Sequence, residues 1–306
     1  MAWLLAGIIP PVLWALVNHT DKYLLSRARH RSSVEVLMVY STLFSLIILP
    51  TLLYFAYSEL FLSWQQVIIQ IIGGILLTLS IYFYLKALDK DEASVVMPFA
   101  LLVPVFGYFF SYFLLGEVLT SKELIACVLI VAGALVLSLE FEEERKIKIK
   151  HGVLLLMILH TGFQAAQETL FKFVTIENSF LVSLFWLHIG IAVCGFILVI
   201  TQKELFGNFT DSVRVNGRVI FGVNFVSEAM SSVGYMVQNY ASLLAPIAII
   251  MSLNGYQPVF VFVFGIIFTI FVPNLVSERI KLKHLIHKGS AILIILIGTI
   301  LIAKTI

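Results

Sequence analysis

Residues 93–106 read Ala-Ser-Val-Val-Met-Pro-Phe-Ala-Leu-Leu-Val-Pro-Val-Phe, and Leu-Leu-Gly-Glu at 114–117 ends the same apolar run. Part of this pattern returns 154 positions later, where Pro-Val-Phe at 258–260 repeats Pro-Val-Phe at 104–106. A match centred on proline at one fixed offset indicates an internal duplication rather than a chance likeness of two apolar strings. The chain is therefore predicted to consist of two related halves.

Composition indicates a membrane protein. Hydrophobic residues make up 60% of the 306 residues and charged residues only 12%, whereas a soluble domain carries about 25% charged residues. A helix needs about 20 apolar residues to cross the roughly 30 Å hydrocarbon core. The sequence predicts an all-α membrane protein with ten transmembrane helices, at residues 3–25, 34–57, 66–88, 93–115, 121–140, 152–173, 179–201, 219–241, 245–272 and 285–304.

The most polar segment divides these spans into two groups of five. Residues 141–150 are predicted to be a charged linker between one five-helix repeat at 2–140 and a second at 151–304. Because five is odd, the second repeat must enter the membrane from the opposite face. The prediction is therefore two inverted repeats around a central cavity, related by an axis in the membrane plane.

Several short motifs carry a family resemblance. Leu-Leu-Gly-Glu at 114–117 closes the fourth span, Lys-Glu-Leu-Ile at 122–125 opens the fifth, and Val-Ala-Gly-Ala-Leu-Val at 131–136 lies within it. Together with the ten spans and the duplication, these motifs resemble the EamA family of the drug/metabolite transporter superfamily, over nearly the whole chain as two copies. The second copy departs from the pattern, since Ser-Glu at 277–278 stands in place of Gly-Glu and is displaced.

The resemblance implies a ten-helix carrier that alternates access to a central cavity and moves small organic metabolites, often outward. It also implies a structural or gating role for Glu117 rather than contact with substrate.

Loop charges predict the orientation. Seventeen of the 20 Lys and Arg residues fall on one predicted face, and only Lys122, Lys172 and Lys304 fall on the other. Loops rich in Lys and Arg stay in the cytoplasm, so both termini are predicted to be non-cytoplasmic, in a multi-pass protein of a prokaryotic inner or plasma membrane. Members of the resembled family commonly begin with a basic, cytoplasmic N-terminus, and the charges of this chain are given precedence over that pattern.

Polar side chains inside the spans mark the candidate substrate site. Such groups are costly in hydrocarbon, so they normally face a bundle interior or a water-filled cavity. The alternative for the amides is hydrogen bonding between helices that only holds the bundle together. The predicted substrate-binding residues are Trp14, Asn18, Tyr82, His160, Gln164, Asn224, Glu228, Asn254 and Gln257.

Two carboxylates, Glu228 and Glu168, are the predicted proton-coupling candidates. At about 1.5 Å rise per residue, Glu228 falls near the middle of the membrane, and Glu168 falls toward the face opposite the basic loops. A buried carboxylate must be neutral, paired or solvated, which favours a functional role for Glu228. His160 falls at a similar depth and is the predicted partner of Glu228.

Pro104 and Pro258 are predicted hinges. Each interrupts helical hydrogen bonding at a matching position of the two repeats. The alternative is a pair of packing kinks without motion.

These features predict a secondary transporter, an exporter or exchanger of small organic metabolites with proton coupling as an option. The alternatives are a flippase for a lipid-linked metabolite and an intramembrane enzyme that uses a span histidine or glutamate as acid or base. Lysines lie near span ends, which favours neutral, zwitterionic or cationic solutes. The spans contain no phosphate-binding loop or metal-spaced His/Glu pair, so no cofactor, metal or nucleic acid is predicted, and the chain is expected to act as a monomer or homodimer in the bilayer.

Overall fold

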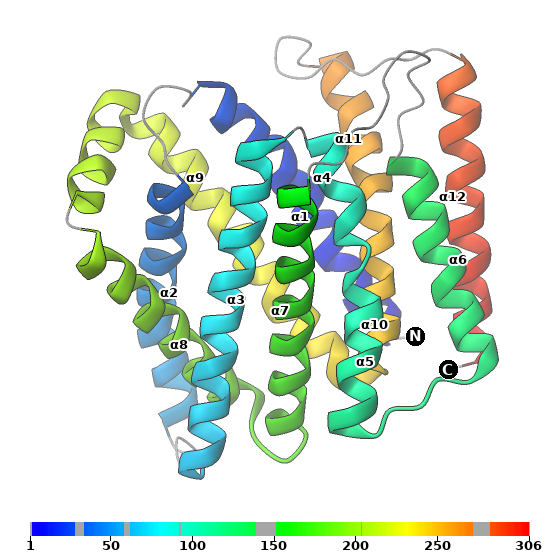
Figure 1. Ribbon diagram of the computed structural model, residues 1–306, viewed down its shortest axis with the longest axis horizontal. Coiled ribbons are helices and arrows are strands. Elements are labelled where there is room, and N and C mark those ends of the chain that lie inside the picture. The colour runs from blue at the N-terminus through cyan, green and yellow to red at the C-terminus, as the bar shows by residue number, and fades with distance from the viewer. Residues whose placement is uncertain are drawn as a thin grey trace.

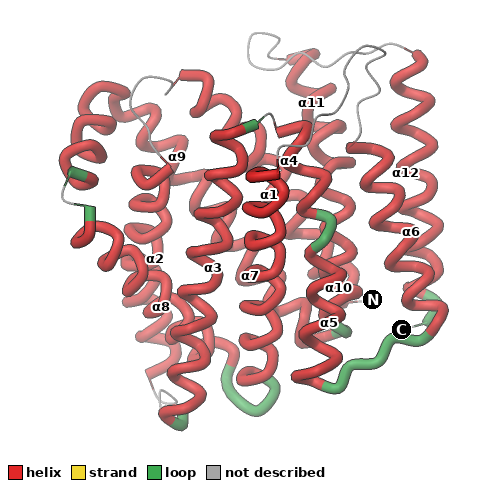
Figure 2. Tube along the Cα trace, in the orientation of Figure 1, coloured by secondary structure: helices red, strands yellow, loops and turns green. Residues whose placement is uncertain are grey.

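The computed structural model describes residues 2–27, 34–57, 62–91, 93–138, 151–202, 204–271 and 282–305. The predicted linker at 141–150 and the Ser-Glu pair at 277–278 lie outside these residues. The described part of the chain is helical and contains no strand, as Figure 2 shows.

The helices follow one another in two series of five segments (Figure 1). The first series is α1 (Ala2–Arg27), α2 (Val34–Ala56), α3 (Trp64–Lys90), the pair α4 (Ala93–Ala100) and α5 (Val103–Leu115), and α6 (Ser121–Ser138). The second is α7 (His151–Thr175), α8 (Phe180–Thr201), α9 (Leu205–Leu244), the group α10 (Ile247–Ser252), η2 (Leu253–Tyr256) and α11 (Gln257–Phe271), and α12 (Leu282–Ala303).

Two predicted spans are broken helices. The span predicted at 93–115 is interrupted between α4 and α5, and the span predicted at 245–272 is interrupted by the 3₁₀ turn η2. Pro104 and Pro258 each occupy the second position of the helix that follows the break. Proline is accepted in the first turn of a helix because that turn has no internal acceptor for its N–H group. The two prolines therefore mark helix starts rather than kinks within one helix.

The eighth predicted span was too short. The prediction began this helix at residue 219 and treated the preceding residues as a loop, but α9 extends over 40 residues from Leu205 to Leu244. The polar residues of its first third lowered the hydropathy without interrupting the helix, because helix formation does not require an apolar face on every turn.

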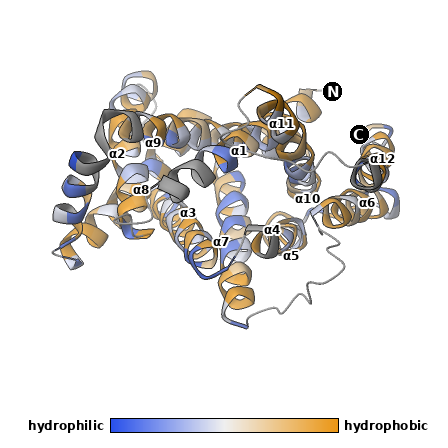
Figure 3. Ribbon diagram, turned by 90° about the horizontal axis from the view of Figure 1, so that it is seen from above, coloured by the Kyte–Doolittle hydropathy of each residue, from blue (hydrophilic) through white to orange (hydrophobic). Residues whose placement is uncertain are grey.

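Seven helical segments of the described chain are long and apolar enough to cross a membrane: Ala2–Thr20, Val34–Ala56, Trp64–Lys90, Val96–Leu115, Ser121–Ser138, Phe180–Thr201 and Ile247–Phe271. A shorter apolar stretch covers Lys288–Ala303. The long helices α7 and α9 are not among the seven, and both carry polar side chains along their length. Figure 3 shows these hydrophilic residues on α7, in the middle of the bundle.

Large apolar side chains cover the outer surface. Phe113, Ile200 and Phe271 are 68%, 73% and 78% exposed. Exposed apolar surface of this kind is unfavourable in water and suits contact with lipid. The protein is therefore an integral membrane protein with several spanning helices.

Helices of the two halves pack against each other in a regular way. Helix α1 packs on α9, α3 on α7, α2 on α8, and α6 on α12. The backbones of α3 and α8 approach each other closely where the helices cross. Cβ atoms on Gly74 and Gly190 would collide there with the carbonyl oxygens of Leu187 and Ile71. Small residues commonly allow such backbone approach in membranes. The outer pair α6–α12 lies at one side of the bundle, and the marks for both chain ends stand toward the lower right in Figure 1.

Candidate functional site

A cavity lies between α2 and α3 of the first half and α8 and α9 of the second. Leucine, isoleucine and methionine side chains form much of its wall. Glu228 is the only Asp, Glu, Lys or Arg among the described residues that line it. The polar lining residues are Ser41, Ser45, Thr78, His188, Glu228, Ser231, Ser232, Tyr235 and Asn239. An apolar wall with a few convergent polar groups is the usual form of a small-molecule site.

Helix α1 supports the α9 wall of this cavity from behind. Trp14 is buried, its Nε1 donates to the Ser231 carbonyl oxygen at 3.5 Å, and its ring lies 5.0 Å from that of Tyr235. Thr20 and Ser227 join the same two helices through hydroxyl groups 2.9 Å apart. Trp14 therefore lies close to the cavity wall that carries Glu228, but it is not itself among the residues that line the cavity.

Glu168 lies in a separate polar cluster between α7 and α9. It is fully buried, and its two carboxylate oxygens accept from the Gln164 and Gln238 side-chain amides at 3.4 Å each. Next to Glu168 on α7, the side-chain amide of Gln167 donates to Asn239 Oδ1 at 3.2 Å. Asn239 also lines the cavity, so the cluster and the cavity share a wall.

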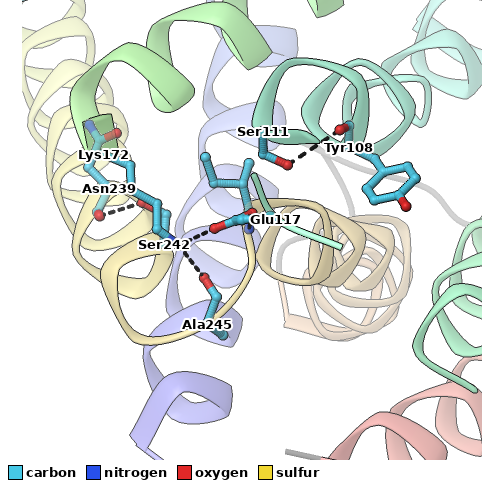
Figure 4. A network of polar contacts seen from close by, with 8 residues as sticks. Tyr108, Ser111, Glu117, Lys172, Asn239, Ser242 and Ala245 are labelled. Carbon is cyan, nitrogen blue, oxygen red and sulfur yellow. Dashed lines mark hydrogen bonds and ion pairs between the residues drawn. The ribbon is translucent and has the colours of Figure 1, made fainter. Parts of the chain in front are cut away.

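An ion pair that the sequence analysis did not anticipate joins the two halves at the lower end of the bundle. Lys172 Nζ lies 2.6 Å from Glu117 Oε1 and donates to the Ala245 carbonyl oxygen at 2.9 Å. The other carboxylate oxygen, Oε2, accepts from the Ile247 backbone N–H at 2.9 Å. Figure 4 shows how Lys172 and Glu117 meet at the junction between α9 and α10. We call this group the interhalf latch.

Gly116 explains how Glu117 reaches the latch. Its φ of +67° lies in the left-handed region, where glycine avoids the Cβ clash of other residues. This conformation ends α5 and allows the Glu117 N–H to bond to the Ser111 carbonyl oxygen at 3.2 Å, a common way to close a helix. The Gly-Glu motif therefore stops one helix and turns a carboxylate toward the other half.

His160 is held by α3 rather than by Glu228. Its Nδ1 lies 2.9 Å from Ser80 Oγ, and the same hydroxyl donates to the His160 carbonyl oxygen at 3.0 Å. Its ring also lies 5.3 Å from that of Tyr84. Among the described residues these contacts fasten α7 to α3, and none of them involves Glu228, the predicted partner of His160.

The remaining predicted residues are spread over the bundle. Tyr82 lies near the upper end of α3, and the Lys86 ammonium nitrogen lies 5.4 Å from the centroid of its ring. Asn224 is buried on α9, and Asn18 is half-buried on α1. Asn254 lies in η2 and Gln257 begins α11. None of these five is among the residues that line the cavity.

The cavity walls from α2 and α8 were missed at the sequence level. Ser41, Ser45 and His188 lie in strongly apolar spans, where isolated polar residues do not form a polar stripe along one face of the helix. His188 Nδ1 is occupied by the Leu184 carbonyl oxygen at 2.9 Å, which leaves its other ring nitrogen for a ligand. Knowledge that α2 packs against α8 would have made these residues candidates for the site.

Comparison with known proteins fits this architecture. Residues 1–139 match the EamA-like transporter family. The match covers 139 of the 306 residues, in the first half of the chain. The resemblance drawn from the motifs of the first half is thereby confirmed, and the apolar helices indicate a multi-pass membrane protein.

Other comparisons bear on the fold alone. No curated protein gives a significant match. The crystal structure of another protein is similar over 99% of this chain and 97% of that chain, with a TM-score of 0.61 and 15% sequence identity. The arrangement of both halves therefore has a counterpart among solved structures.

Proposed function

We propose that this protein is a secondary transporter, an exporter or exchanger of small organic metabolites that works by alternating access. The observation that carries the proposal is the cavity with a single described carboxylate, Glu228, between helices of both halves. A site shared by two halves can be exposed to either side when one half moves against the other. The match of residues 1–139 to a family of transporters favours transport over catalysis.

The proposal includes ten membrane-spanning segments in two inverted five-helix repeats. The helix contacts support it. Replacing each helix by its counterpart five segments away turns the α1–α9 contact into the α7–α3 contact, and both occur. The α2–α8 and α6–α12 contacts map onto themselves. This exchange is expected for two copies related by a twofold axis.

The helix breaks at Pro104 and Pro258 support a hinge role for both. They occur at equivalent positions of the two halves and separate short helices, α4 and α10, from longer ones. Broken helices in matching positions are common at transporter binding sites. Rocking at these breaks would change access without unfolding a helix.

The cavity chemistry favours a neutral, zwitterionic or cationic solute. Its polar lining offers hydroxyls, an amide, an imidazole and the Glu228 carboxylate. We assign proton coupling to Glu228, because a carboxylate at a cavity can bind a proton from one side of the membrane and release it to the other as access alternates. The solute would be handled by a monomer or homodimer in the bilayer, without nucleic acid.

Counterflow in proteoliposomes tests the function. Vesicles preloaded with one unlabelled metabolite are expected to accumulate the same labelled metabolite transiently, because a carrier exchanges solute across the membrane. A panel of neutral, zwitterionic and cationic metabolites is screened, with protein-free vesicles as the control. Movement of a labelled lipid without any solute counterflow would replace this function by lipid flipping, and turnover without flux would replace it by catalysis.

The proposed orientation places both termini outside the cytoplasm, because 17 of the 20 Lys and Arg residues fall on the other face. In a bacterial host, alkaline phosphatase fused after Ile306 is expected to be active, and green fluorescent protein fused there is expected to be dark. A fluorescent, phosphatase-inactive pair of fusions would mean that loop charge does not set the topology of this chain.

A further inference from the structure

Three fully buried glutamines have side-chain oxygens for which the described residues offer no hydrogen-bond donor. They are Gln70 on α3, Gln167 on α7 and Gln238 on α9. A buried polar group without a partner destabilises the folded protein. Three such oxygens in one region therefore call for a ligand that can satisfy them together.

These three glutamines are linked to the segment of α7 that carries Glu168. The amide of Gln238 donates to the Glu168 carboxylate at 3.4 Å, and Gln167 is the preceding residue on α7. Gln70 donates to the carbonyl oxygen of Phe171, one turn further along α7, at 3.4 Å. A Cβ atom on Gly73 would lie 3.9 Å from Gln70 Oε1 and 4.0 Å from Gln167 Cγ, so these two side chains are neighbours.

The Glu168 carboxylate has no described cation as counter-ion. Its hydrogen-bond partners are the two neutral amides. Lys172 lies one turn away on the same helix, but its ammonium is 2.6 Å from Glu117 Oε1 and 2.9 Å from the Ala245 carbonyl oxygen in the interhalf latch. A carboxylate buried in a low-dielectric region is unfavourable unless a positive charge or a proton accompanies it.

A proton and a metal cation differ in what they can satisfy. One proton on Glu168 supplies a single donor and leaves the other oxygens without partners. A hard cation is bound by several oxygens at once, from carboxylate and amide groups. A divalent ion is disfavoured, because only one formal negative charge is present and the described residues hold no group of three His, Cys, Asp or Glu for a metal.

We propose that the Glu168 carboxylate and the three glutamine oxygens bind a dehydrated monovalent metal cation, such as sodium, between α3, α7 and α9. The site would neutralise the buried charge and fasten helices from both halves. It adjoins the cavity through Asn239, which accepts from Gln167 and lines the cavity. Binding of the cation does not depend on transport, so the site can be tested without a known substrate.

Thermal unfolding of the purified full chain in detergent tests the site. At equal ionic strength, the Tm in 100 mM NaCl is expected to be about 5 °C higher than in choline chloride, because a ligand that binds only the folded state stabilises it. Equilibrium binding of radioactive Na⁺ alone should be weakened at least tenfold by Glu168→Gln. This variant keeps the shape of the side chain and removes its charge, and its fold is checked by size-exclusion chromatography.

Two further variants keep the test decisive. Gln167→Leu removes one of the oxygens and is expected to weaken Na⁺ binding several-fold, and it serves if Glu168→Gln does not fold. Glu228→Gln is the matched control, since it neutralises the other interior carboxylate, and it should leave Na⁺ binding unchanged even if transport is lost. A Tm that is the same in sodium, potassium and choline, or unchanged Na⁺ binding in Glu168→Gln, would overturn the site. Stability that depends on pH but on neither metal ion would assign the cluster to a proton and would also overturn it.

Discussion

Glu228→Gln is expected to reduce pH-dependent flux through the protein by at least tenfold. The amide has nearly the same shape as the carboxyl group, so it can keep neighbouring contacts, but it cannot take up or release a proton. Glu228 is the only described Asp, Glu, Lys or Arg of the cavity lining, and no other lining carboxylate is available to replace it. The measurement is counterflow of a transported metabolite in proteoliposomes, with and without an imposed pH gradient.

The matched control for this variant is Glu123→Gln. Glu123 belongs to the cap of α6, where its carboxylate accepts from the Thr120 N–H at 2.7 Å, and it is not a cavity residue. Glutamine also serves at this position of a capping box, so flux and its pH profile should stay unchanged. If Glu228→Gln transports at the rate and pH profile of the unmodified protein, Glu228 is a packing residue and does not couple protons.

The second large effect is expected at the interhalf latch. Lys172→Met removes the cation from the Glu117 carboxylate, whose side chain is 14% exposed, and leaves the Ile247 N–H at 2.9 Å as its described partner. Removing one member of a buried ion pair costs about 3–5 kcal/mol. We expect a loss of this size in the free energy of unfolding, measured by denaturant titration in detergent.

A double-mutant cycle separates the pair from the packing of each side chain. The double variant Lys172→Met, Glu117→Gln should be more stable than Lys172→Met alone, because it leaves no unpaired buried charge. Lys86 and Glu35 form the control pair, 2.7 Å apart with side chains 28% and 15% exposed. Lys86→Met should cost less than about 1 kcal/mol, as is usual for pairs in contact with solvent. Equal losses for the two lysine variants would show that the latch contributes no more than a surface pair.

The latch also bears on the transport cycle. It ties the end of α5 in the first half to α7 and to the α9–α10 junction in the second. Any motion that separates the halves at this end of the bundle must break it. A variant that lacks the latch is therefore expected to spend more time open at that end, at the expense of stability.

The sequence by itself determined the fold class, the approximate helix positions and the two places where long spans break. The length of the apolar segments determines the fold class and the helix positions, because a segment in lipid must satisfy its own backbone hydrogen bonds and does so as a helix. Proline determines where the two long spans break, because it lacks an N–H donor and is accepted at a helix start. The start of α9 at Leu205 was missed, since polar residues lower hydropathy without ending a helix.

Only the tertiary structure decided which polar side chains meet. The depth of a residue in the membrane follows from its position along a helix. The direction in which a side chain points depends on the rotation of each helix and on the neighbour that packs there. His160 therefore contacts Ser80 of α3, α2 and α8 supply seven of the 16 residues that line the cavity, and Lys172 pairs with a glutamate 55 residues away. Hydropathy carries no information on these pairings, because they depend on contacts between helices distant in sequence.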